Sequence, residues 1–202
     1  MSNWEYKKGT MVNDVKLLCS TCNLSKESKR AILKDIAFRY AERSDILRVN
    51  EEYHPELENA NVNIKKIGNK YWSEKALKQY LKNKDSKDSV KGLIFDHIVP
   101  KKNFVDHVIG KPQDILNIPD LKEFLDKVLV GCVITKEEDE LFNKKGLRQK
   151  MPTRIGTDLI KNSKEPWARY KETGIVVCEL SWNNGIKNGS IPLIIKKDII
   201  GD

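Results

Sequence analysis

The 202-residue chain is long enough for one sizeable core, and its 39% hydrophobic and 33% charged residues are typical of a soluble globular protein. It has no run of about 18 apolar residues, which excludes a membrane-spanning helix, and residues 1–12 lack the apolar segment of a secretory signal, so we expect a cytoplasmic protein with no membrane partner. The formal net charge of +8, from 37 Lys and Arg against 29 Asp and Glu, favours a polyanionic partner such as nucleic acid or anionic lipid, although a basic solvated surface alone would give the same balance.

Apolar residues at helical spacing characterise the N-terminal part of the chain. They predict a helix over Lys26–Arg43, with Ser25 as its N-cap, and a second helix over residues 73–81. The side chains expected to face a core are Ile32, Leu33, Ile36, Ala37 and Tyr40 in the first helix, and Ala76, Leu77, Tyr80 and Leu81 in the second. The polar run KNKDSKDS at residues 82–89 predicts a linker after this helical part.

Short apolar runs separated by turn signals follow the linker. GLIF at residues 92–95 predicts a buried strand, and VLVGCVI at residues 128–134 predicts another. Between them we expect an irregular loop over residues 101–119, then a short helix over residues 120–127. A further helix is expected over residues 135–146, because glycine commonly follows the last helical turn.

The last fifty residues carry strand patterns. GIVVCEL at residues 174–180 and the apolar run at 193–200 predict two strands. Asn-Gly turn signals at residues 183–185 and 188–189 separate them. With the helices before them, these strands lead us to expect an α+β protein.

The residues that carry chemistry lie in the segment Phe95-Asp96-His97-Ile98-Val99-Pro100, where an acid and a histidine stand together at the end of an apolar strand. Hydrolysis of a phosphodiester needs a base that takes a proton from water, and a histidine with a pKa of about 6.5 suits this task at neutral pH. The reaction also needs a cation against the charge on the phosphate, and a carboxylate suits Mg²⁺ or Mn²⁺. Both side chains can serve one site if the chain bends before the proline.

The second half of such a site is expected on the helix that opens at Thr135. Thr135 and Glu138 have the spacing of a capping box, in which each satisfies a backbone donor of the other, so Glu138 has a structural role. Asp139 and Asn143 are four residues apart and share one helical face. Asp139 is the preferred second metal ligand, with Asn143 as its support or substitute.

The segment Asp96-His97-Ile98-Val99-Pro100, with Val133-Ile134-Thr135 leading into the ligand-bearing helix, resembles the HNH (His-Me finger) endonucleases, especially those of restriction enzymes and RNA-guided CRISPR nucleases. The resemblance covers about a quarter of the chain. It implies a ββα-metal core in which Asp96 binds one catalytic metal ion and His97 activates water. Asp139 or Asn143 would complete the metal site, and the product would carry a 5′-phosphate.

Two features depart from the family pattern. The segment between Pro100 and Val128 is longer than the compact family core, so we expect it to hold a small insertion. The family also has a middle asparagine that steadies the loop before the second strand. Asn117 is the candidate for this loop-stabilising role.

Basic residues flank the two halves of the expected site. Phosphate contacts with DNA are expected from Lys101, Lys102, Lys144, Lys145 and Arg148, and the basic run continues through Lys150 and Arg154. The alternative is a solvated basic face without a partner.

The remaining motif is the C-x-x-C of Cys19 and Cys22, which are candidate ligands of a structural Zn²⁺. Zinc needs four ligands, and the others would come from Cys132, Cys178 or His54, although both of these cysteines lie in apolar strand patterns. We expect His107 to be a loop residue. Trp167 is expected to anchor a core, or alternatively to stack on a base or sugar.

We therefore expect three parts: a helical part at residues 1–88 that docks DNA or carries a zinc knuckle, an HNH ββα-metal core at residues 89–152, and a small α/β extension at residues 153–202 packed on the core. The expected function is metal-dependent endonucleolytic cleavage of DNA in restriction or anti-phage defence, or by a mobile element. Two alternatives stay open: a non-catalytic zinc-knuckle protein that binds nucleic acid, and an RNase or toxin effector on the same core. Cleavage of both strands at a palindrome would need two sites and hence a homodimer.

Overall fold

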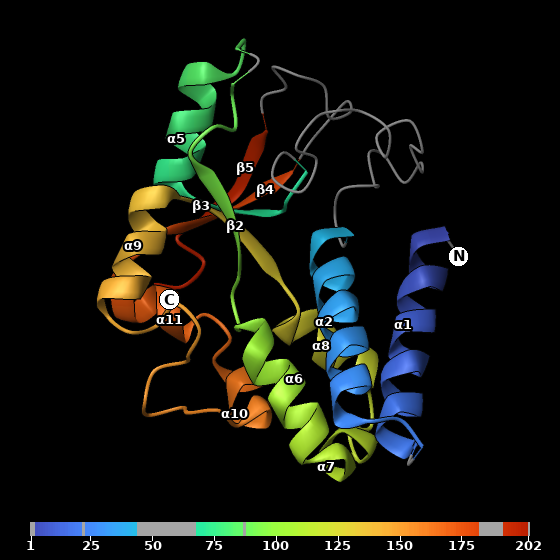
Figure 1. The fold of residues 1–202 in the computed structure, drawn as a ribbon. Coiled ribbons are helices and arrows are strands. Elements are labelled where there is room, and N and C mark those ends of the chain that lie inside the picture. The colour runs from blue at the N-terminus through green and yellow to red at the C-terminus, as the bar shows by residue number, and fades with distance from the viewer. Residues whose placement is uncertain (1–2, 22, 44–67, 87, 182–191, 202) are drawn as a thin grey trace.

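Helices and strands are mixed along the chain, and the protein is α+β as the sequence predicts (Figure 1). The structure, a computed structural model, describes residues 3–21, 23–43, 68–86, 88–181 and 192–201. Its helices are α1 (Asn3–Ser20), α2 (Lys26–Arg43), α5 (Glu74–Asn83), α6 (Lys101–Gly110), α7 (Pro112–Leu116), α8 (Leu121–Val128), α9 (Lys136–Lys144), α10 (Leu159–Lys164) and α11 (Ala168–Thr173). Its strands are β1 (Tyr71–Ser73), β2 (Leu93–His97), β3 (Gly131–Thr135), β4 (Val177–Ser181) and β5 (Leu193–Lys197). Within these ranges, no helix is both long and apolar enough to span a lipid bilayer.

One five-stranded sheet joins strands from all three expected parts of the chain. The strand order is β2-β3-β1-β4-β5, in which β1 and β3 are parallel and the other neighbours are antiparallel. Strands β2 and β3 pair from Leu93 opposite Thr135 to His97 opposite Gly131, and α9 begins directly after β3. Strand β2 therefore lies at one edge of the sheet, with its last residue beside the first residue of β3.

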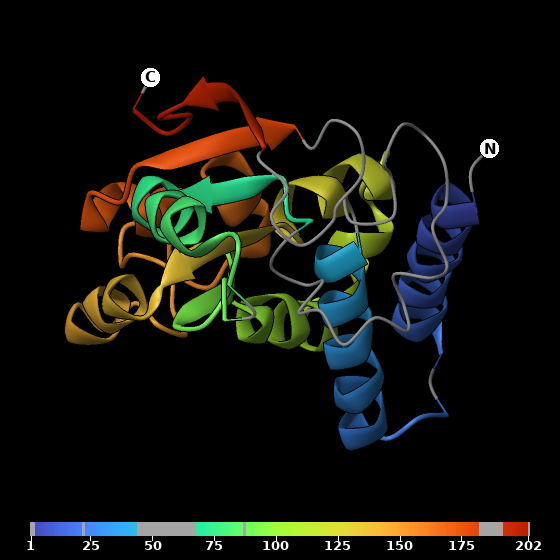
Figure 2. The same ribbon diagram turned by 90° about the horizontal axis from the view of Figure 1, so that it is seen from above.

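The two faces of the sheet bury different clusters. Because side chains alternate along a strand, Val133 of β3 faces a small core with Trp72 and α5, whereas Cys132 and Ile134 face the larger core. That larger core continues into the helical layer, where α1 and α2 lie side by side at the far end of the molecule from α5 and α9 (Figures 1 and 2). The end of β2 thus lies where the sheet meets the helical layer.

The two helices predicted in the N-terminal part form with nearly the predicted bounds. Helix α2 has the predicted bounds, and the Ser25 hydroxyl accepts a hydrogen bond from the Ser28 N–H at 3.1 Å, although Ile32, expected in the core, is 40% exposed. Helix α5 begins one residue after the predicted start because Ser73 is its N-cap. The expected stripe of α5 is buried at Ala76, Leu77 and Tyr80 and partly buried at Leu81.

The prediction of an irregular loop over residues 101–119 is wrong. Helices α6 and α7 occupy most of it, because Phe104, Val105 and Val108 form an apolar stripe at helical spacing that is buried in the larger core. His107, expected in that loop, is buried on α6, and its Nδ1 accepts a hydrogen bond from the Leu159 N–H at 3.2 Å. The proline and glycine of the segment separate two helices instead of marking a loop.

Several strand and helix limits also differ from the prediction. Strand β2 continues through Asp96 and His97, and β3 begins at Gly131 because Val128 ends α8. Helices α1, α10 and α11 and strand β1 were not expected. The predicted turn signals at residues 183–185 and 188–189 lie outside the described residues.

A buried carboxylate couples the starts of two helices. Glu138 is 2% exposed, and its Oε2 accepts hydrogen bonds from the Ser73 hydroxyl at 2.5 Å and the Thr135 N–H at 2.9 Å. The Thr135 hydroxyl in turn accepts from the Glu138 N–H at 3.2 Å, so the predicted capping box is confirmed. Because Ser73 caps α5 and Thr135 caps α9, Glu138 binds the N-termini of both helices together.

We predict that Glu138→Ala lowers the free energy of unfolding by about 2–3 kcal/mol, because two buried donors lose their acceptor. Urea unfolding followed by circular dichroism measures the change. The matched control is Glu140→Ala on the exposed side of α9, for which a change below about 0.5 kcal/mol is expected. Equal effects of the two substitutions would contradict the coupling.

Candidate functional site

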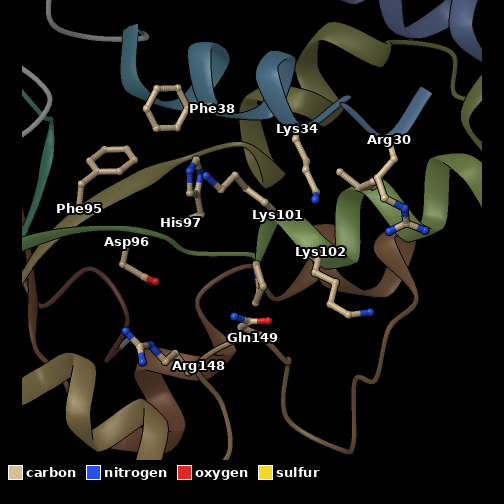
Figure 3. Close-up of a pocket in the computed structure, with 12 residues that line it drawn as sticks. Arg30, Lys34, Phe38, Phe95, Asp96, His97, Lys101, Lys102, Arg148 and Gln149 are labelled. Carbon is tan, nitrogen blue, oxygen red and sulfur yellow. The ribbon is translucent and has the colours of Figure 1, made fainter. Parts of the chain in front are cut away.

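A pocket of about 700 Å³ lies beside the end of β2 and is bordered by α2 and α6 (Figure 3). Its charged lining consists of Arg30, Lys34, Lys101, Lys102, Arg148 and one acid, Asp96. Arg30 and Lys102 pair with Asp106, and Arg148 pairs with Asp139, so five cations stand against three carboxylates and the pocket keeps an excess of positive charge that attracts anions. Aromatic rings of Phe38 and Phe95 complete one end of it, next to His97.

Asp96 and His97 are consecutive residues at the end of β2, and their side chains point to opposite faces of the strand. The chain is extended through both residues, so His97 points towards α2, on the same side as Phe95, and Asp96 points towards Arg148 (Figure 3). Both side chains nevertheless line the pocket.

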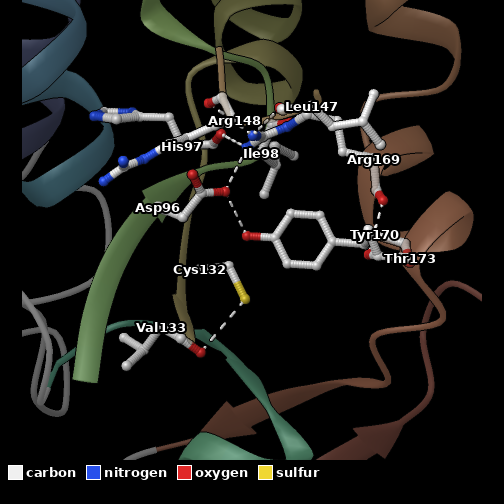
Figure 4. Close-up of polar contacts among 10 residues, drawn as sticks. All are labelled: Asp96, His97, Ile98, Cys132, Val133, Leu147, Arg148, Arg169, Tyr170 and Thr173. Carbon is white, nitrogen blue, oxygen red and sulfur yellow. Dashed lines mark hydrogen bonds and ion pairs between the residues drawn. The ribbon is translucent and has the colours of Figure 1, made fainter. Parts of the chain in front are cut away.

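The Asp96 carboxylate is held through one of its oxygens. Oδ2 accepts a hydrogen bond from the Tyr170 hydroxyl at 2.7 Å and forms an ion pair with Arg169 (Figure 4). Burial raises the pKa of Asp96, the Arg169 charge and the Tyr170 hydrogen bond oppose this, and the nearby Asp139 charge adds to it. Within the described chain Oδ1 has no hydrogen-bond partner, so this oxygen is available to a ligand.

Arg169 on α11 organises the backbone around the site. Its side chain has no exposed surface and donates to the carbonyls of His97 at 2.5 Å and Ile98 at 3.2 Å. It also donates to the Leu147 carbonyl at 2.9 Å and the Arg148 carbonyl at 3.2 Å, beyond the end of α9. The guanidinium therefore connects the end of β2 with the segment after α9.

His97 is a buried imidazole without a hydrogen-bond partner. It is 7% exposed, and within the described chain neither ring nitrogen makes a hydrogen bond. Burial lowers the pKa of His97 to about 3, with further lowering by the charges of Lys101 and Arg169. The ring is therefore neutral at neutral pH, and in these surroundings it binds a proton only weakly.

Packing orients the His97 ring where hydrogen bonds do not. The Phe95 ring meets it edge-on, with 5.2 Å between ring centroids. Phe95 occupies the space over Gly131, the partner of His97 across the strands, and a Cβ at Gly131 would lie only 2.0 Å from the Phe95 Cζ. Glycine at position 131 thus leaves the room for the ring that packs against His97.

The other predicted metal ligands lie on α9 as expected, but in different surroundings. The Asp139 side chain is 14% exposed and pairs with Arg148 at 3.2 Å, and its charge acts on Asp96. Asn143 is exposed, and Asn117 is exposed at the C-terminal end of α7. Asp139 is therefore the residue of these three that the structure brings next to Asp96.

The predicted phosphate contacts divide into two groups. Lys101, Lys102 and Arg148 line the pocket, whereas Lys144 and Lys145 are exposed around the end of α9, where the Lys145 ammonium donates to the Glu172 carbonyl at 2.5 Å. Lys150 is exposed, and Arg154 pairs with Glu165 at 2.6 Å.

The cysteine motif is only partly within the described residues. Cys19 on α1 is buried in the larger core, and burial raises its pKa to about 11, whereas Cys22 and His54 lie outside the described residues. Cys132 and Cys178 are buried in β3 and β4. In the described part of the chain, no three or more His, Cys, Asp and Glu side chains are grouped to hold a metal ion. The Trp167 ring packs edge-on against the rings of Tyr71 and Tyr170, with 5.2 Å between ring centroids in each pair.

Sequence reasoning missed the residues that reach the site from a distance. Arg169 and Tyr170 belong to an unpredicted helix, and their only signal is an arginine within an aromatic-rich segment, Trp167 to Tyr170. Arg30 and Lys34 lie on a correctly predicted helix. The sequence does not show that the face they share with Phe38 lines a pocket beside β2. Comparison with protein-family models, curated proteins and solved structures found no match to this chain.

We predict that Arg169→Met lowers the free energy of unfolding by about 3–5 kcal/mol, because it leaves the Asp96 carboxylate without its cation and four carbonyls without their donor. Tyr170→Phe removes only one hydrogen bond to the same carboxylate, for which we expect a loss of about 1–2 kcal/mol. Chemical denaturation of both variants measures the difference. A smaller loss for Arg169→Met than for Tyr170→Phe would overturn the central role of the guanidinium.

Proposed function

We propose that this protein is a metal-dependent endonuclease of the HNH type that hydrolyses phosphodiester bonds in DNA. The observation that carries the proposal is the neutral, unpartnered imidazole of His97 in a pocket with five cations and the Asp96 carboxylate. A phosphodiester is an anion, so the cations would bind it beside the His97 imidazole, and its negative charge would raise the pKa of His97 against the lowering by burial, Lys101 and Arg169.

The order of elements supports the HNH assignment. An antiparallel β2–β3 pair is followed directly by α9, which is the sequence of elements in a ββα-metal core. Asp96 and His97 end the first strand, and Asp139 lies in the first turn of the helix. The segment between the strands contains α6, α7 and α8, which correspond to the insertion expected there.

In the proposed reaction the chain's own groups bind the phosphate and move one proton. Lys101 and Arg148 contact the phosphate oxygens, which places the phosphorus beside His97. A ring nitrogen of His97 takes a proton from water as the water oxygen attacks phosphorus, and the bond from phosphorus to the 3′-oxygen breaks with that oxygen as the leaving group. Arg169 keeps Asp96 and the His97 backbone in place during this step.

The acidic residues fit a hard divalent cation. Mg²⁺ in proteins binds through one or two carboxylates together with water and substrate phosphate. Asp96 offers Oδ1, and Asp139 offers a second carboxylate close enough to repel its charge, with Asn143 as the alternative donor. A bound Mg²⁺ or Mn²⁺ would neutralise charge on the phosphate and stabilise the leaving oxygen.

We predict that the protein nicks or linearises supercoiled plasmid with Mg²⁺ or Mn²⁺, and that EDTA abolishes this activity. His97→Ala should reduce the cleavage rate at least about 100-fold, because general-base catalysis typically contributes that much. The control is His107→Asn, whose amide oxygen can replace Nδ1 as acceptor for the Leu159 N–H.

Three outcomes would count against parts of the proposal. Equal cleavage by wild type and His97→Ala would exclude His97 as the base. Binding of DNA without cleavage under any divalent cation would favour the non-catalytic alternative. Faster cleavage of RNA than of DNA would favour the RNase alternative.

A second prediction separates the two candidate ligands on α9. Asp139→Ala should raise the Mg²⁺ concentration needed for half-maximal cleavage about tenfold or more, because it removes one of two anionic ligands. Asn143→Ala, on the exposed face, should leave that concentration within about twofold. Titration of Mg²⁺ in the plasmid assay measures both, and the reverse order of effects would assign the ligand to Asn143.

A further inference from the structure

Helix α2 forms a wall of the pocket and presents one face to it. Arg30, Lys34 and Phe38 follow one another at intervals of four residues, so they lie on one side of the helix, about 6 Å apart along its axis. Figure 3 shows them in a row opposite His97, Lys101 and Lys102. The pocket therefore has one basic wall from α2 and another from α6, with aromatic rings at one end.

The volume of this pocket suits one strand of nucleic acid. Its volume of about 700 Å³ falls within the range of about 300–1,000 Å³ that is typical of small-ligand pockets. Duplex DNA is instead read by elements that protrude into a major groove about 12 Å wide. Asp106 of α6 pairs with Arg30 of α2 at 2.5 Å, which joins the two walls, and with Lys102 of its own helix at 2.6 Å. The cations of both walls are therefore placed to bind the phosphates of an unpaired strand.

The lining has the two components that proteins use for single strands. Such sites combine a basic groove along the backbone with aromatic rings on which bases stack. Lys34 forms no ion pair within the described chain, so its charge is available to a phosphate. The Lys101 ammonium lies 4.8 Å from the centre of the Phe38 ring, which places a cation beside the aromatic end of the pocket. The unpartnered nitrogens of His97 face the aromatic end.

We infer that the pocket binds single-stranded nucleic acid, with its phosphates along Arg30, Lys34 and Lys101 and a base against the Phe38–Phe95 end. This inference rests on the proposed function for the identity of the reacting group, and it narrows the substrate from a duplex to an unpaired strand. A duplex would be cut only where its strands separate.

Binding without cleavage tests the inference on the intact chain. Wild-type protein in EDTA is titrated into fluorescein-labelled 12-nucleotide DNA, RNA of the same sequence, and the corresponding duplex DNA, and fluorescence anisotropy is followed at fixed salt. At least tenfold tighter binding of one single strand than of the duplex is expected, and the tighter of DNA and RNA identifies the sugar.

Two substitutions on α2 locate the binding. Lys34→Ala should weaken single-strand binding about fivefold or more through loss of a phosphate contact. Phe38→Leu should weaken it about tenfold through loss of stacking. Arg39→Ala is the control: it removes one charge from the same helix, but its partner is Asp35 and it does not line the pocket, so a change below about twofold is expected. Thermal unfolding establishes that each variant is folded.

The outcomes separate this inference from the proposed function. Duplex binding as tight as single-strand binding, or unchanged single-strand affinity in both Lys34→Ala and Phe38→Leu, would overturn the inference. His97-dependent cleavage of fully paired duplex alongside that result would leave the nuclease proposal intact. Preferential single-strand binding without cleavage by any divalent cation would support the inference and reject the nuclease proposal.

Discussion

The side chain of Arg169 is positively charged and has no exposed surface. The Asp96 carboxylate and the backbone on both sides of the candidate site form an ion pair or hydrogen bonds with it. Removing such an ion from water costs on the order of several kcal/mol. The Asp96 carboxylate and four carbonyl oxygens offset this cost, and the Phe142 ring lies 4.6 Å from the guanidinium carbon. Because the donors of arginine form a rigid fork, these acceptors are held in one arrangement. The positions of Asp96 and the His97 backbone therefore depend on a residue of α11.

This dependence makes the fold and the site inseparable. Asp96 and Arg169 are 73 positions apart in the chain, and the sheet and the helical layer meet where they pair. One oxygen of Asp96 balances the guanidinium, which leaves its other oxygen to a ligand. The Asp96 carboxylate and the His97 ring are both held in place beside the basic lining. An anion that binds there therefore requires little reorganisation of these groups.

Local patterns in the sequence predicted the elements whose determinants are local. The apolar period of α2, the Ser73 cap of α5 and the capping box of α9 each depend on residues within one or two turns. The segment 101–119 differs from the prediction because its proline and glycine separate two helices, and the apolar stripe on α6 makes the first of them helical. The adjacent pair Asp96 and His97 was visible in the sequence. Arg169 and the wall formed by α2 were not, because their roles come from contacts across more than fifty residues.

The contact between Gly131 and Phe95 has an evolutionary consequence. Position 131 lies on β3, away from the pocket lining, yet any side chain there meets the Phe95 ring before it meets anything else. A larger residue at position 131 is compatible with this backbone only if the Phe95 ring moves or position 95 becomes smaller, and either change alters the contact with the His97 ring. The two positions are thus expected to change together among descendants of this chain, and lineages that lose the pair would need another way to hold the imidazole.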